Sequence, residues 1–307
     1  MDKRLARTDI LFVLGFLFML VVAVGAFFYG VKVGTDRAES SQAQDAKTAS
    51  AEKVASPNAY SLQDLVSFYH TVFLPYREFM NEWQNAENKW LSVESTDRSA
   101  SIKELVKLAS DQYDSAKVAY IPPVSPLLQE AQDNYLKSLK LYMTSLSSYA
   151  SSANEGTGSI LLGQIKKDAF YKEAVKMALD GQTDYYHSMA MWASMVDMTV
   201  PYDTQYETQI ELSKWKTLPL ISRNLISAQY LQEQSLTGSF LPQDLTARID
   251  GFLASGQAAT MKLKTAGAVA DLLTRTDAVR EGDFLQQKSR FYATQLLPQL
   301  PFFSPDK

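Results

Sequence analysis

The sequence predicts an all-α protein with a single N-terminal transmembrane helix, a flexible linker and an extracytoplasmic antiparallel helical bundle whose long helices are rich in aromatic residues. Three observations lead to this fold class. A long uncharged apolar run lies near the N-terminus, apolar and aromatic residues later recur at spacings of three and four, and no segment alternates as strands do. We expect a cytoplasmic head over residues 1–9, the transmembrane helix over 10–31, the linker over 32–58 and the helical domain over 59–303.

The apolar run is long enough to cross a bilayer. Residues Ile10 to Tyr29 carry no charge, and at about 1.5 Å of rise per residue a helix of this length spans the ~30 Å hydrocarbon core. A cleavable export signal is the alternative, because basic residues precede the run and small residues around Ala26 would suit a peptidase. The run continues past Ala26 to Tyr29, beyond the usual ~7–15 apolar residues of a signal peptide, which favours an uncleaved anchor.

Basic residues on the two sides of the run predict its orientation. Lys3, Arg4 and Arg7 lie in the short head, whereas Lys32 and Arg37 lie beyond the run beside acidic residues. We therefore expect the protein in the plasma membrane, with a cytoplasmic N-terminus and the rest of the chain outside.

Small residues recur every fourth position at the end of the run, at Ala26, Gly30 and Gly34. Such a stripe can let two transmembrane helices approach closely, so one interpretation is an anchor packing face and a homo-oligomer. The favoured interpretation is that glycines at the membrane edge simply loosen the chain where it leaves the bilayer.

Composition narrows the class of protein further. The chain has no cysteine, which excludes disulfides, thiolate nucleophiles and cysteine zinc sites. The net charge is −4 and no basic cluster contains interleaved aromatics, so nucleic acid is not an expected partner. Between Thr35 and Asn58, Val54 is the one aliphatic side chain larger than alanine, too little to offset the entropy of ordering. These features are typical of a bacterial envelope protein with a tethered domain.

Four long helices are predicted after Pro57. Their apolar seams run over 62–90, 102–120, 128–153 and 171–196, each with steps of three and four. Ser61 and Ser125 are expected N-caps, the second followed by proline at the first helical position. Short connections between such helices favour an antiparallel bundle.

Proline and glycine predict breaks in this pattern. Pro75 predicts a kink near residues 71–75, and Asp180-Gly181 is a point where the fourth helix divides in two. Residues 154–159 form the clearest break and a candidate sub-boundary of the domain. Shorter helices are expected at the end of the chain, near 243–276 and 278–297.

Large aromatic residues recur at intervals of seven along the first and third helices. They are Tyr69, Tyr76, Trp83 and Trp90, and then Tyr135, Tyr142 and Tyr149. One interpretation is a stacking surface for sugars or aromatic ligands. The favoured interpretation is a bundle core, in which rings fill the interior while their polar atoms reach its rim.

The sequence carries no recognisable catalytic constellation. His70 and His187 are the only histidines, and Asp184 precedes His187 by three residues, but no Glu-x-x-His pair of a di-iron bundle exists. A zinc site built from both histidines and distant carboxylates stays an alternative that no spacing indicates. Neither a nucleophile elbow nor a phosphate-binding glycine loop is present. We therefore expect no enzyme, no cofactor and no metal.

Two functions agree with this layout. The first is a binding or scaffold module that recognises envelope proteins or the cell wall through its helices. The second is a sensory, ligand-binding bundle, which would signal through a partner because nine cytoplasmic residues hold no signalling domain. An envelope hydrolase is the third and weakest hypothesis, because it lacks a motif.

Overall fold

The computed structural model describes residues 59–93, 96–201 and 210–304. Every regular element in these ranges is helical, and the one bridge between extended residues joins Glu211 to Thr265. The all-α prediction is therefore confirmed. Contacts divide the chain after Ser56, and the described residues all belong to the second unit, Pro57–Lys307.

No helix within the described ranges is long and apolar enough to span a bilayer. The predicted head, transmembrane helix and linker lie in residues 1–58, outside the described part of the chain. The same is true of the predicted packing stripe at Ala26, Gly30 and Gly34.

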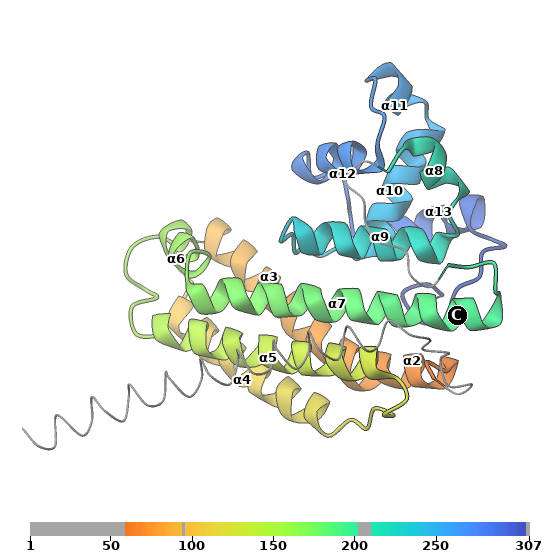
Figure 1. Cartoon of the computed structure of the whole chain (residues 1–307). Helices are drawn as coiled ribbons and strands as arrows, with labels where there is room; N and C mark the ends of the chain where they lie inside the picture. Colours follow the sequence, from red (N-terminus) through yellow and green to blue (C-terminus); the bar gives the residue numbers. More distant parts are fainter. Residues whose placement is uncertain (1–58, 94–95, 202–209, 305–307) are drawn as a thin grey trace, which may run out of the picture. The chain divides into compact units, whose positions relative to one another are not determined.

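A helical bundle forms the first part of the unit. Its long elements are α3 (Leu74–Ser92), α4 (Arg98–Lys117), α5 (Pro126–Tyr149) and α7 (Ala169–Val196). Helix α4 packs between α3 and α5, and α7 packs along α5 in the opposite direction (Figure 1). The short helix α6 (Gly158–Ile165) connects α5 to α7 and packs on α3.

The first long helix changes geometry at one place. Helix α2 (Leu62–Phe68) begins with a capping box, in which Ser61 Oγ accepts from the Asp64 backbone at 3.2 Å and the Asp64 carboxylate accepts from the Ser61 backbone. A π-helical turn, Tyr69–Phe73, then leads into α3. Pro75 has no backbone N–H for the carbonyl of Thr71, so the α-helical ladder is interrupted where the sequence predicts a kink.

Helix α7 is continuous over 28 residues. The break considered at Asp180-Gly181 does not occur, and Gly181 has another role. A β-carbon there would lie 3.1 Å from the Ala131 carbonyl oxygen and 3.3 Å from Asn134 Cβ on α5. The glycine therefore lets α5 and α7 approach closely, which offsets its low helix propensity.

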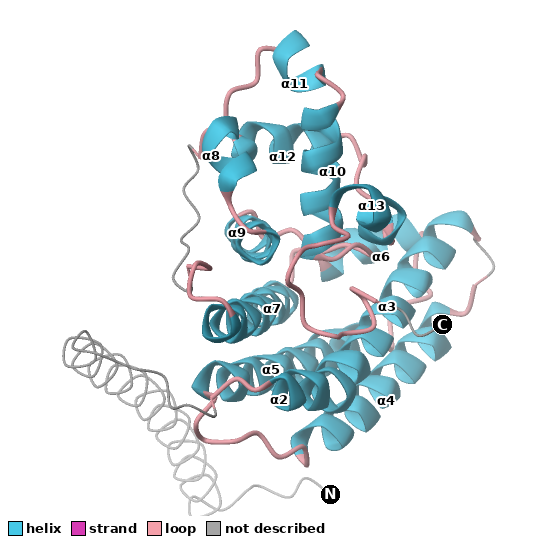
Figure 2. Ribbon diagram, turned by 90° about the vertical axis from the view of Figure 1, so that its right-hand side faces the viewer, coloured by secondary structure: helices cyan, strands magenta, loops and turns pink. Residues whose placement is uncertain are grey.

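The remaining helices form a layer on the other side of α7. Helix α9 (Leu220–Glu233) packs along α7, and α10 (Pro242–Ala254) packs on α9, so α5, α7, α9 and α10 follow one another in space (Figure 2). The other elements of this layer are α8 (Leu212–Thr217), α11 (Gln257–Thr260), α12 (Ala266–Arg275) and α13 (Asp283–Phe291).

The helices predicted at the end of the chain are too long. Over 243–276 the chain forms α10, α11 and α12, because Gly256 (φ 76°) and Lys262 (φ 55°) adopt left-handed backbone conformations that end a helix. Over 278–297 only α13 is helical, and Gly282 (φ 84°) precedes it.

Asp250 joins the helices of this layer. Its carboxylate accepts from Trp215 Nε1 at 2.8 Å and from the Tyr292 hydroxyl at 2.5 Å, and it pairs with Arg223. Three elements distant in sequence are thereby held to α10, and both charges of the ion pair are largely buried.

Candidate functional site

The aromatic residues singled out in the sequence lie mostly inside the bundle. Tyr76, Trp83, Trp90, Tyr135 and Tyr142 are buried. Neighbouring rings touch: the centroids of Tyr76 and Tyr135 are 4.5 Å apart, and those of Trp83 and Trp90 are 5.7 Å apart. No open stacking platform is made by these five rings.

The other two aromatic residues are partly exposed. Tyr69 lies in the π-helical turn, with its ring centroid 5.6 Å from that of Phe302 near the C-terminus. Tyr149 ends α5 and donates to the Gln164 carbonyl at 3.4 Å. They lie at opposite ends of the bundle, so the structure does not bring them together.

The two histidines are far apart in the sequence and have different surroundings. His70 is exposed and packs edge-on against Tyr69, whereas His187 lies half-buried on α7. Within the described ranges, no three histidine, aspartate or glutamate side chains are placed to hold a metal ion.

A cleft runs along α3 where this helix meets α7 and the α9–α10 connection, residues 234–241. Its inner pocket has a volume of about 40 Å³ and reaches Tyr135 of α5 and Gln182 of α7. Its outer groove is wider, about 280 Å³, and extends along α3 towards Lys166. Met80, Thr237 and Gly238 line both parts, so the two parts adjoin one another.

Two residues that line the inner pocket have buried polar atoms without a partner among the described residues. Among the described residues, nothing bonds to the buried Tyr135 hydroxyl or to the buried Gln182 Nε2. The neighbouring Tyr76 hydroxyl, by contrast, shares a hydrogen bond of 3.1 Å with Ser138 Oγ. An unpaired buried polar group costs about 1–3 kcal/mol, so these two atoms require water or a ligand.

Burial favours the protonated form of the Tyr135 hydroxyl. Desolvation raises the pKa of Tyr135 well above its usual value, and the nearby Tyr76 hydroxyl adds to the rise. The Tyr135 hydroxyl therefore stays protonated at physiological pH and is available as a donor.

One charged side chain lines the inner pocket. Arg77 Nη2 donates to the Ser239 carbonyl oxygen at 2.9 Å and so ties α3 to the α9–α10 connection. Its positive charge lowers the pKa of Tyr135, against the larger effect of burial.

The outer groove is mainly polar. Lys166 Nζ lies 2.9 Å from Glu87 Oε1, an ion pair between the end of α6 and α3. The amides of Gln84 and Asn88 line the same side. Across them lies Tyr171, whose pKa is raised to about 12 by burial and then by the Glu87 charge.

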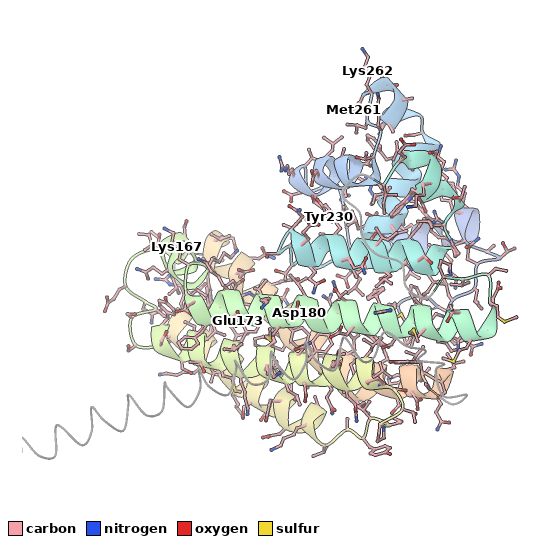
Figure 3. The ribbon with its side chains drawn as sticks, in the orientation of Figure 1. Lys167, Glu173, Asp180, Tyr230, Met261 and Lys262 are labelled. Atoms are coloured by element: carbon pink, nitrogen blue, oxygen red, sulfur yellow. The ribbon has the colours of Figure 1, made fainter. Side chains whose placement is uncertain are left out.

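A second polar cluster lies on α7 outside the cleft. Asn134 Nδ2 donates to Asp184 Oδ2 at 3.1 Å, and Glu130 and Asp180 lie close enough to act on the same carboxyl. Burial, then the Glu130 charge, raises the pKa of Asp184 to about 7. Asp180, which Figure 3 labels on α7 beneath α9, accepts from Gln232 Nε2 at 2.7 Å.

Sequence reasoning singled out Tyr76, Trp83 and Tyr135 but overlooked the other residues that line the cleft. Gln182 was the one polar member of the predicted seam over 171–196, and a polar side chain on an apolar stripe was the available signal. Arg77 and the 234–241 connection gave no comparable signal, because their meeting depends on tertiary packing.

Comparisons of the chain with protein-family models, curated proteins and solved structures find no match.

Proposed function

We propose that the chain is a single-pass, membrane-anchored envelope protein whose extracytoplasmic helical unit is a binding module. The anchor is supported by the uncharged run over 10–31 and the orientation by its flanking basic residues. The cleft carries the binding role, because it combines a polar groove with an inner pocket whose buried polar atoms lack partners.

The membrane placement is tested in whole cells. A tag after Lys307 should be digested by external protease, and the full-length chain should stay in the membrane fraction after alkaline extraction. Protection of the tag from protease, or release of an intact chain by alkali, would show the placement to be wrong.

Of the two binding functions, recognition of a small ligand in the cleft has the better geometric support. The test is a thermal-shift screen of the full-length chain in detergent against metabolites and cell-wall fragments, since a ligand of the native state raises Tm. Thr237 is exposed and lines both parts of the cleft, so Thr237→Trp should fill it and abolish the shift.

The matched control is Thr260→Trp, an exposed position on α11 outside the cleft. A ligand that stabilises both variants equally binds elsewhere, and a screen without any stabilising ligand contradicts the proposal.

A scaffold for protein partners is the second candidate. It is favoured by exposed apolar side chains at the α4–α5 connection, where Val118 is 83% and Tyr120 is 77% exposed. Site-specific cross-linking from Tyr120 in intact cells should capture one defined envelope protein, and Val118→Ser should weaken that product. Cross-links spread over many unrelated proteins would contradict a specific scaffold.

A further inference from the structure

We propose that the inner pocket binds the carboxylate of a small organic acid, whose body extends past Met80 and Gly238 into the outer groove. This inference rests on the proposed ligand-binding function and adds the chemical class of the ligand. It follows from the donors that line the pocket, the uncompensated charge among them and the apolar character of the other walls.

Arg77 brings a positive charge to the wall of the inner pocket. A guanidinium has five N–H donors, and the hydrogen bond to the Ser239 carbonyl uses one of them on a neutral acceptor. Among the described residues, no carboxylate lies within 4.0 Å of this side chain. A carboxylate would compensate the charge and fit the planar fork of the guanidinium with two bonds.

Tyr135 and Gln182 each carry a donor that has no partner among the described residues. The Tyr135 hydroxyl is protonated and its side chain is only 1% exposed, and Gln182 Nε2 is a buried donor. Both line the same pocket as Arg77. A carboxylate has two oxygens with about four lone-pair sites, so it can accept from all three side chains. An ammonium group would be repelled by Arg77 and would find no carboxylate on the pocket wall.

The other walls of the inner pocket are largely apolar. Leu179, Leu231, Leu236, Phe240 and Met80 supply apolar surface around the donors. A volume of about 40 Å³ suits a carboxylate but little more. The body of the acid must therefore extend past Met80 and Gly238, which the pocket shares with the outer groove.

Matched acids and amides test this proposal. The full-length chain, labelled with ¹³C at its methionine methyl groups, is titrated in nonionic detergent with butyrate, hexanoate and phenylacetate and with the three corresponding amides. The Met80 methyl lies where the two parts of the cleft meet and is assigned with Met80→Leu. At least one acid should shift this signal saturably, and its amide should bind at least about tenfold more weakly.

Variants of Arg77 and Tyr135 separate the effect of the pocket's charge on acid binding from the effect of its shape. Arg77→Gln should weaken binding of that acid about tenfold or more and should weaken amide binding much less, whereas Arg77→Lys should retain part of the affinity. Tyr135→Phe should weaken the acid by about three- to tenfold, because it deletes one donor. Arg275→Gln, at an exposed position of α12 outside the cleft, is the control and should change nothing.

The outcomes distinguish this inference from the function on which it rests. Equal binding of acids and amides at Met80, or acid binding unchanged in Arg77→Gln, would overturn the carboxylate class and leave the cleft as a site for neutral ligands. If no acid shifts Met80 but a compound from the thermal screen does, only the carboxylate inference fails. If nothing in either experiment perturbs Met80, both fail.

Discussion

Gly158 faces the backbone of Trp90 so closely that a β-carbon at residue 158 would lie 2.0 Å from the Trp90 carbonyl oxygen. The contact seats the first residue of α6 on the last turns of α3. The Glu87–Lys166 ion pair joins the same two helices at the other end of α6, beside the outer groove. Gly158 therefore helps to fix one end of the cleft.

Gly158→Ala should destabilise the helical unit strongly. The Trp90 carbonyl belongs to a helix and cannot turn away, so α6 or α3 must shift, at a cost of about 1–3 kcal/mol or more. Gly163→Ala is the matched control, because Gly163 is exposed on the same helix with no atom within 4 Å of its added carbon. It should gain about 0.5–1 kcal/mol from helix propensity. Urea unfolding of the two full-length variants compares them, and equal stabilities would contradict the contact.

Arg98 should be difficult to replace. This buried side chain donates from Nε to the Ala153 carbonyl and from Nη2 to the Gly156 carbonyl, each at 2.7 Å, and thereby holds the α5–α6 connection against α4. Arg98→Lys cannot make both bonds and should cost about 2 kcal/mol, since hydrogen bonds to charged groups are worth about 1.5–3 kcal/mol each.

The same measurement supplies a control for Arg98. Lys103→Ala removes a basic side chain from an exposed position of the same helix and should change stability by less than about 0.5 kcal/mol. Hydrogen exchange should show faster opening of residues 150–157 in Arg98→Lys alone. A stability loss without that local effect would show that the connection does not depend on Arg98.

Asp250→Ala should loosen the layer formed by α8 to α13. It leaves Arg223 without its carboxylate and removes the acceptor of Trp215 Nε1 and of the Tyr292 hydroxyl. Breaking a buried ion pair on one side costs about 3–5 kcal/mol. Urea unfolding followed by tryptophan fluorescence should show a transition at lower urea. Glu233→Ala, which removes an exposed carboxylate of α9 outside this cluster, should leave the transition in place.

Much of the bundle follows from local rules. Ser61 and Asp64 form a capping box, which marks the start of α2 in the sequence itself. Pro75 predicts an irregular turn because proline has no backbone N–H, whatever the tertiary fold. Gly181 shows where such rules stop. Its low helix propensity suggested a break, but the close approach of α5 decides in favour of a continuous α7, and that approach involves residues fifty positions away.

The candidate site was less predictable than the helices. Tyr135 was identified as an aromatic residue on a helical seam, but no spacing shows that its hydroxyl lacks a partner. That property arises only when α5, α7, Arg77 and the 234–241 connection meet. Local patterns predict which face of a helix is apolar, whereas the polar atoms left inside depend on how several faces are packed together.

Asp184 should make the unit less stable as pH rises from about 4 to 7. Its pKa is raised to about 7 in the folded chain, and an unfolded aspartate titrates near ~3.9. Between these values the folded state keeps a proton that the unfolded state has lost, so the free energy of unfolding falls as pH rises and is constant above the folded pKa.

Asp184→Asn cannot ionise and keeps an acceptor for Asn134. Its unfolding free energy should therefore exceed that of the wild type by an amount that grows through this window to about 1–3 kcal/mol. Asp133→Asn, exposed on the neighbouring helix α5, should follow the wild-type pH profile, and a parallel profile for Asp184→Asn would show that Asp184 does not titrate in this range.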